Sequence, residues 1–170
     1  MTNVQIVSGD ITQQPADALI TAINSEGMWF GGIDGAIQRV AGSMFHAQAR
    51  NAAPLVDGAA LLAGSIDGHR GKFANVIFII DDLRQPLRNI VSAGLQKAEE
   101  SRFAEITLPT IRTGVMAGVV EPTVEAALDE MVSAIKAFMA TDPKYVRSIT
   151  IVVYNDAHAE RYLAKQLADI

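Results

Sequence analysis

A glycine-rich segment between Asn24 and Asp34 has the residue types of a phosphate-binding loop. Its glycines, Gly27, Gly31 and Gly32, let the backbone approach a ligand closely. Asp34 is a good capping residue for the helical pattern that follows, and a helix N-terminus offers unpaired N–H groups that suit a phosphate. We interpret the segment as a binding loop for a nucleotide diphosphate. A plain strand-to-helix connection in which Asp34 is only a cap is the alternative, because Gly-Gly loops are common.

A second candidate loop spans residues 110–119 and follows a short expected strand. It carries Thr113-Gly114 and Ala117-Gly118, so it could enclose a diphosphate from the other side. A flexible connection before the next helix would have the same composition. Arg112 could meet a phosphate, but we favour a solvated surface arginine, because arginine is mostly exposed in proteins.

Two further positions could meet the base of a nucleotide. Asp10 directly follows Gly9 at the end of the first expected strand. Its carboxylate could accept hydrogen bonds from an exocyclic amine, or it could bond its own backbone as a turn residue. Tyr154 ends the last expected strand, where it could stack on a base or pack in the core.

Strands and helices alternate along the chain and must position these loops. We expect strands at residues 4–7, 18–23, 60–66, 75–80, 105–108 and 148–154. We expect helices after Asp34 and at residues 43–52, 87–101, 122–139 and 157–168, with Pro122 in the first turn of its helix. This order implies a largely parallel sheet covered by helices on both faces, within one domain over residues 1–170. Ligands of such sheets bind at the carboxyl ends of the strands.

The composition excludes several classes of protein. The 170 residues include no cysteine and three scattered histidines, so we expect no disulfide, thiolate nucleophile or metal site. A net charge of −5 lacks the basic footprint of a DNA-binding protein. No apolar stretch is long enough to span a membrane, and no signal peptide is recognisable. We expect a cytoplasmic monomer that needs no cofactor.

The same loops, in the same order, resemble the macro domain family. The similarity begins at Gly9-Asp10-Ile11-Thr12 and continues through Ala22-Ile23-Asn24, which is similar to the Asn-Ala-Ala-Asn segment of the family. It extends to Gly31-Gly32-Ile33-Asp34-Gly35-Ala36-Ile37 and to Leu108-Pro109-Thr110-Ile111-Arg112-Thr113-Gly114-Val115. The resemblance implies a three-layer α/β/α sandwich with a mixed, largely parallel central sheet, and it implies binding of ADP-ribose.

The resemblance also implies a role for each loop. Asp10 would accept a hydrogen bond from the adenine amino group, the backbone N–H of Ile11 would assist, and Tyr154 would lie against the adenine. The residues expected around the diphosphate are Gly31, Gly32, Ile33, Thr113, Gly114, Val115 and Met116.

Hydrolases of this family carry an Asn and an Asp ten residues apart in these motifs, and Asn24 and Asp34 keep that spacing. The resemblance implies that Asn24 orients the distal ribose. Asp34 would position or deprotonate a water beside the anomeric carbon. The substrate would be an ADP-ribosyl ester, either mono-ADP-ribosylated protein or O-acetyl-ADP-ribose.

Some residues depart from the family pattern, namely Thr21, Trp29, Phe30, Gln38 and Met116. The altered loop at Trp29 and Phe30 motivates a second hypothesis, a module that binds ADP-ribose without turnover. A third hypothesis, an RNA or poly(A) binder, conflicts with the acidic charge, because such binding follows a positive groove. An NAD-dependent oxidoreductase is excluded, since no Gly-x-Gly-x-x-Gly motif follows the first strand.

Overall fold

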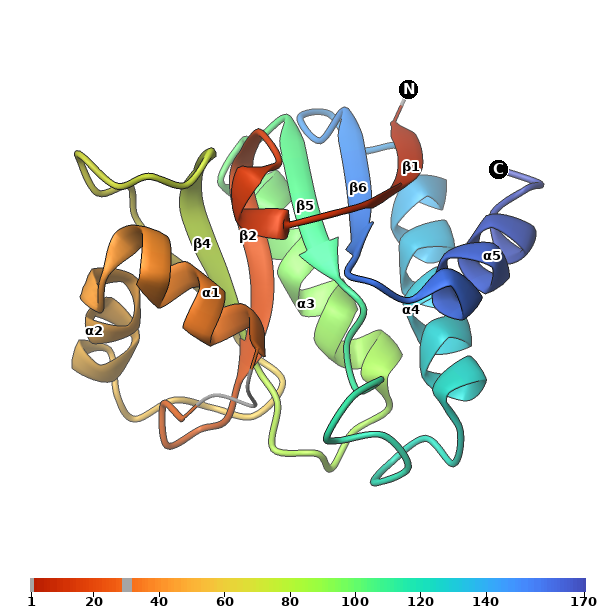
Figure 1. Ribbon diagram of the computed structural model, residues 1–170, viewed down its shortest axis with the longest axis horizontal. Coiled ribbons are helices and arrows are strands. Elements are labelled where there is room, and N and C mark those ends of the chain that lie inside the picture. Colours follow the sequence, from red (N-terminus) through yellow and green to blue (C-terminus); the bar gives the residue numbers. More distant parts are fainter. Residues whose placement is uncertain (1, 29–31) are drawn as a thin grey trace.

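A six-stranded sheet in the order β1-β6-β5-β2-β4-β3 forms the centre of the computed structural model, which describes residues 2–28 and 32–170 (Figure 1). The strands are β1 (Asn3–Ser8), β2 (Ala16–Ile23), β3 (Ala60–Ala63), β4 (Phe73–Ile80), β5 (Glu105–Pro109) and β6 (Ser148–Val153). The edge strand β3 pairs antiparallel with β4, and the other paired strands run parallel. The expected mixed, largely parallel sheet is therefore confirmed.

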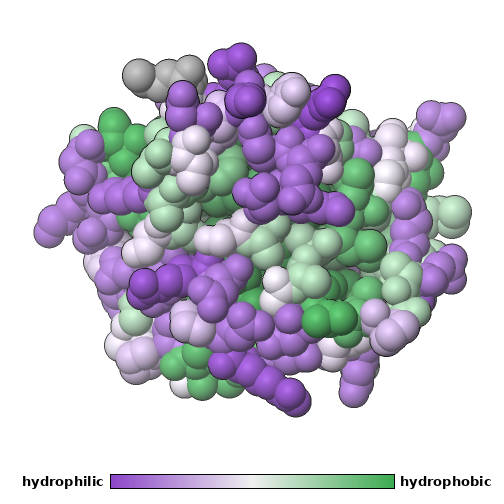
Figure 2. Space-filling view, turned by 180° about the vertical axis from the view of Figure 1, so that it is seen from behind, coloured by the Kyte–Doolittle hydropathy of each residue, from purple (hydrophilic) through white to green (hydrophobic). Residues whose placement is uncertain are grey.

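Helices cover both faces of this sheet. The helices are α1 (Gly32–Ala41), α2 (Met44–Asn51), α3 (Leu87–Glu100), α4 (Val124–Ala140) and α5 (Ala157–Gln166), and a short 3-10 helix, η1 (Ile11–Gln13), follows β1. In Figure 1, α1 and α2 lie in front of the sheet, and α3 and α4 lie behind it. The view from behind in Figure 2 shows hydrophilic side chains around a paler, less polar centre. The three-layer α/β/α sandwich is confirmed. In the described part of the chain, no helix is long and apolar enough to cross a membrane.

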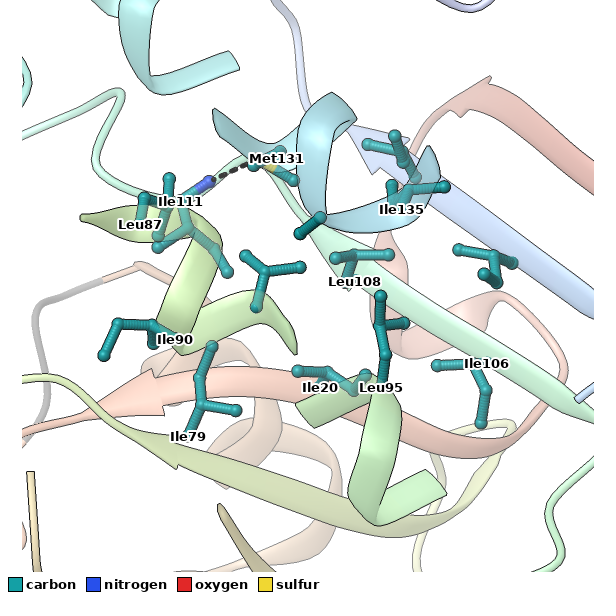
Figure 3. Close-up of a cluster of buried hydrophobic side chains, with 14 of the residues drawn as sticks. Ile20, Ile79, Leu87, Ile90, Leu95, Ile106, Leu108, Ile111, Met131 and Ile135 are labelled. Atoms are coloured by element: carbon teal, nitrogen blue, oxygen red, sulfur yellow. Dashed lines mark hydrogen bonds between the residues drawn. The ribbon is translucent and has the colours of Figure 1, made fainter. Parts of the chain in front are cut away.

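The continuous apolar runs of the central strands follow from burial on both faces. Ile20 on β2 and Ile79 on β4 belong to the core under α3 and α4 (Figure 3). Their neighbours Leu19 and Phe78 point to the opposite side, into the core under α1 and α2. Because successive strand residues face opposite sides, a strand between two helical layers needs apolar residues at every position.

Three of the boundaries that differ from the sequence prediction are informative, and the others move by one or two residues. Helix α1 begins at Gly32, so Asp34 lies in its first turn and not before it. Thr123 is the N-cap of α4, and its hydroxyl accepts a first-turn N–H at 3.0 Å, which leaves Pro122 before the helix and not in it. The strand expected at residues 60–66 stops at Ala63. In each case the sequence pattern identified the element, while local hydrogen bonds set its ends.

Helix α3 packs so closely on the sheet that position 94 has little room for a side chain. A Cβ atom on Gly94 would lie 2.8 Å from Cγ2 of Ile79 and 3.1 Å from Cγ2 of Ile20. These methyl groups lie in the core, and moving them away would cost packing energy, because protein interiors are close-packed.

Substitution of Gly94 by valine is expected to lower the free energy of unfolding by about 1–3 kcal/mol, the usual cost of overpacking a core. Urea denaturation followed by circular dichroism measures the change. Ser92→Val is the matched control, because Ser92 is an exposed residue of the same helix. Equal stability of the Gly94→Val and Ser92→Val proteins would contradict the close contact.

Candidate functional site

A cleft of about 450 Å³ opens at the carboxyl edge of the sheet. Its size lies within the range of small-molecule sites. Most of the predicted site residues line it, namely Asp10, Ile11, Gly32, Ile33, Asp34, Thr113, Gly114, Val115, Met116 and Tyr154. Of the positions that depart from the family pattern, Thr21 also lines the cleft. Trp29, Phe30 and Gly31 lie outside the described residues.

One corner of the cleft is built by the ends of β1 and β6. The two strands are neighbours, and the N–H of Gly9 donates to the carbonyl of Val153 at 3.0 Å, which brings Asp10 and Tyr154 to the same corner. Tyr154 is 76% exposed, so the alternative of a core tyrosine is wrong. An exposed ring beside a carboxylate can stack on a flat base while the carboxylate accepts from an amine.

Asp10 has two uses for its carboxylate. It is the N-cap of η1, and Oδ1 accepts from the backbone N–H of Thr12 at 3.0 Å and from the Thr12 hydroxyl at 2.8 Å. The turn interpretation is therefore correct for this oxygen. The other oxygen, Oδ2, has no hydrogen-bond partner among the described residues, so it can accept from a ligand at the cleft.

The start of helix α1 forms the middle of the cleft wall. Gly32 and Ile33 are its first two residues, and both line the cleft. The first four N–H groups of a helix have no acceptor within the helix. Together with the helix dipole, they make this wall suitable for an anion.

Asp34 sits deeper in the same wall and is held by a residue that the sequence did not mark. Only 2% of Asp34 is exposed, and its Oδ1 lies 2.8 Å from Nε2 of His46 on α2. The alternative that Asp34 merely caps a helix is wrong, because it lies inside the first turn and contacts another element. The burial of His46 on α2, beside Phe45, comes from the structure, and no pattern in the sequence indicated a role for this histidine.

Asn24 does not line the cleft. Its Oδ1 accepts the N–H groups of Glu26 at 3.0 Å and of Met28 at 2.9 Å, which closes a turn after β2. This is the local use for which asparagine is favoured in turns. Asn24 lines an adjoining depression, which shares one residue, Asp81, with the cleft. The ribose-orienting role of Asn24 stays a prediction.

Arg112 differs most from its prediction. Its side chain is 2% exposed, and it donates through Nε and Nη2 to both oxygens of Asp81 at 3.1 and 2.7 Å. Nη1 donates to Oε1 of Glu121 at 2.8 Å. Burial disfavours the charged guanidinium, but the hydrogen bonds to both carboxylates outweigh it and raise the pKa of Arg112. The interpretation of Arg112 as a solvated surface residue is wrong.

These ion pairs, which we call the Arg112 cluster (Arg112, Asp81 and Glu121), fix the base of the second loop. Glu121 also accepts the N–H of Leu87 at 3.1 Å, at the start of α3. The N–H of Ile111, next to Arg112, contacts the sulfur of Met131 on α4 at 3.5 Å (Figure 3). The cluster thus ties the loop to the end of β4 and to the start of α3, and the neighbouring Ile111 adds a contact to α4.

No group of three or more His, Cys, Asp or Glu side chains within residues 2–28 and 32–170 could hold a metal ion. The carboxylates and the helix start that line the cleft can form hydrogen bonds, bind an anion and transfer a proton.

Comparison with known proteins identifies the family. Residues 20–127 match the family model of the macro domain. The chain belongs to the macro domain family. A macro domain-containing protein of Streptomyces nogalater is 28% identical over 179 residues, which cover 99% of this chain and 94% of the relative. The ADP-ribose glycohydrolase MACROD2 of Homo sapiens is 26% identical, and the match covers 95% of this chain but 39% of that protein.

Among solved structures, the Trypanosoma brucei macrodomain in complex with ADP-ribose superposes with a TM-score of 0.81 at 20% sequence identity. The match covers 96% of this chain and 68% of that chain. At this identity the comparison concerns the fold, and it agrees with the sandwich described above.

In this macro domain, replacing Arg112 by methionine is expected to lower the free energy of unfolding by about 3–5 kcal/mol, because two buried carboxylates would lose their counter-charge. Urea denaturation is the measurement. Arg88→Met is the matched control, since Arg88 makes a similar two-bond pair with Glu130 but is 57% exposed. The control is expected to change stability little. A small effect of both substitutions would contradict the structural role of the Arg112 cluster.

Proposed function

We propose that this macro domain binds ADP-ribose in the cleft. The observation that carries the proposal is the meeting of the four predicted binding segments at one cleft of suitable size, namely Gly9-Asp10, the 24–34 segment, the 110–119 loop and Tyr154. The solved Trypanosoma brucei relative with ADP-ribose supports the choice of ligand.

The proposed ligand lies across the cleft from the β1 and β6 corner to Asp34. The adenine stacks on Tyr154, and its amino group donates to Asp10. The diphosphate lies between the start of α1 and residues 113–116 of the second loop. Arg112 is engaged by its carboxylates, so the negative charge is met mainly by backbone N–H groups. The exposed side chain of Arg39 on α1 lines the same wall and adds a positive charge.

The placement of the adenine is tested with Asp10→Asn. An asparagine keeps one oxygen for the bonds to Thr12, but it replaces the other oxygen by an N–H donor, which repels an amino group. The affinity for ADP-ribose is expected to fall about 10-fold or more, the loss of one hydrogen bond to a charged group. Isothermal titration calorimetry measures the dissociation constant.

The same titration with the hypoxanthine analogue of ADP-ribose is the internal control. This ligand carries a carbonyl where adenine carries its amino group, so Asp10→Asn is expected to improve its binding. Asp67→Ala, an exposed position away from the cleft, is expected to change neither affinity. An unchanged preference between the two ligands in Asp10→Asn would place the adenine elsewhere.

A second function, hydrolysis of ADP-ribosyl esters, is favoured by Asp34. The Asp34 carboxylate is buried and its orientation is fixed by a hydrogen bond to another side chain, which a surface helix cap does not need. The name of the MACROD2 relative, an ADP-ribose glycohydrolase, supports this class of reaction. The proposed substrates are mono-ADP-ribosylated protein and O-acetyl-ADP-ribose.

In the proposed reaction, a water oxygen attacks the anomeric carbon of the distal ribose. In an ester carried on this carbon, the bond from the carbon to the acyl oxygen breaks, and the acyl group leaves as a carboxylate. Asp34 positions the water and accepts its proton, which then passes to solvent. Asn24 orients the ribose hydroxyl groups through its amide nitrogen, because its oxygen is engaged in the turn.

Hydrolysis is tested by the release of ADP-ribose from a glutamate-modified protein. Asp34→Asn preserves the shape of the side chain and an acceptor for His46 but removes the base. It is expected to lower kcat by about 10²–10⁴-fold. Equal rates for Asp34→Asn and wild type would remove the role of Asp34. Tight binding of ADP-ribose with no release by wild type would identify a reader module without turnover.

A further inference from the structure

A buried histidine, His46, contacts the carboxylate that the proposed reaction uses. We propose that His46 is a positioning residue of the hydrolase, which holds Oδ1 of Asp34 and thereby sets the orientation of the carboxylate at the cleft wall. This inference rests on the proposed hydrolysis of ADP-ribosyl esters.

The contact joins two consecutive helices behind the cleft wall. Nε2 of His46 on α2 lies 2.8 Å from Oδ1 of Asp34 on α1. The His46 side chain is fully buried, and that of Asp34 is 3% exposed. The distance is typical of a strong hydrogen bond, and an ionised carboxylate can only accept, so Nε2 is the donor.

The imidazole ring is itself held by the sheet. Its centroid lies 4.9 Å from that of Phe78 on β4, with 57° between the ring planes. Phe78 is fully buried in the core under α1 and α2. A ring packed in this way has few alternative rotamers, so it offers Asp34 a donor at a fixed point.

A fixed donor matters for Asp34 because of the chemistry assigned to it. A buried carboxylate is costly unless it is hydrogen-bonded or paired. A general base must also lie within about 2.6–3.2 Å of the proton that it takes. A bond to Oδ1 opposes rotation of the carboxylate about its last torsion. His46 therefore acts through Asp34 and has no contact with the substrate in this scheme.

The structure also explains why a plain core histidine is the weaker interpretation. His46 contacts Asp34, a residue that lines the cleft wall. Loss of a purely structural histidine would destabilise the fold and leave the chemistry of folded molecules intact. Loss of a positioning residue would lower kcat in molecules that are fully folded.

The experiment compares His46→Gln, His46→Asn and His46→Leu with wild type. A glutamine can bring its amide N–H close to the place of Nε2, whereas an asparagine is too short to do so. His46→Asn and His46→Leu are expected to lower kcat for ester hydrolysis by about 100-fold, the scale of a misplaced catalytic group. His46→Gln is expected to recover most of the rate. KM and the ADP-ribose dissociation constant are expected to stay within about 2-fold, well under one factor of ten in affinity.

The same substitutions are repeated in an Asp34→Asn background, where a residue that acts through the Asp34 base has no further effect on kcat. Thermal unfolding of each variant shows that the rates come from folded protein. Wild-type kcat in His46→Asn, or an equal loss in both backgrounds, would overturn the positioning role while hydrolysis stands. If His46→Leu does not fold, the comparison of glutamine with asparagine decides. No release by wild type would overturn the proposed hydrolysis itself, and the role of His46 with it.

Discussion

The ion pairs of Arg112 are the constraint on which the shape of the cleft depends. One guanidinium neutralises part of the charge of two carboxylates, Asp81 and Glu121, that burial would otherwise make costly. Asp81 directly follows β4, Arg112 lies in the loop after β5, and Glu121 lies three residues before α4. Arg112 itself has a left-handed backbone, with φ of 60°, which a non-glycine residue adopts only when its surroundings hold it there. The ion pairs of Arg112 therefore fix the base of the second loop, and residues 113–116 of this loop line the cleft.

Because Arg112 is paired with two carboxylates, its charge is largely neutralised before an anion enters the cleft. Arg112, which from the sequence could have met a phosphate, is engaged by Asp81 and Glu121. The chain as a whole carries a charge of −5. In the proposed complex, the diphosphate is met mainly by N–H groups at the start of α1 and in the second loop, which are directional and short-ranged. Such a site selects the shape of a ligand more than its charge. It is a poor basis for binding a long polyanion, which agrees with the argument against RNA.

Much of the architecture could be predicted from the sequence because it depends on periodicity. Apolar runs such as that of β4 indicate strands between two helical layers, and the loop motifs indicate which strand ends carry the site. The errors concern side-chain contacts between distant elements. The sequence around Arg112 does not indicate its ion pair with Asp81, which lies 31 residues away in the chain. The turn that Asn24 closes was not predicted either, while its role toward a ribose stays a prediction.

The start of helix α1 shows how a small shift in structure changes the chemistry of one residue. Had the helix begun after Asp34, this carboxylate would face the N–H groups of its own first turn, as a cap does. The helix begins at Gly32, so the N–H groups without an acceptor in the helix are those of residues 32–35, and Asp34 lies within the first turn with a buried side chain. An inward carboxylate needs a donor, and His46 provides one from the next helix. The N–H groups of the helix start and the buried carboxylate thus lie in the same helical turn, which places the reactive end of the proposed site beside its phosphate end.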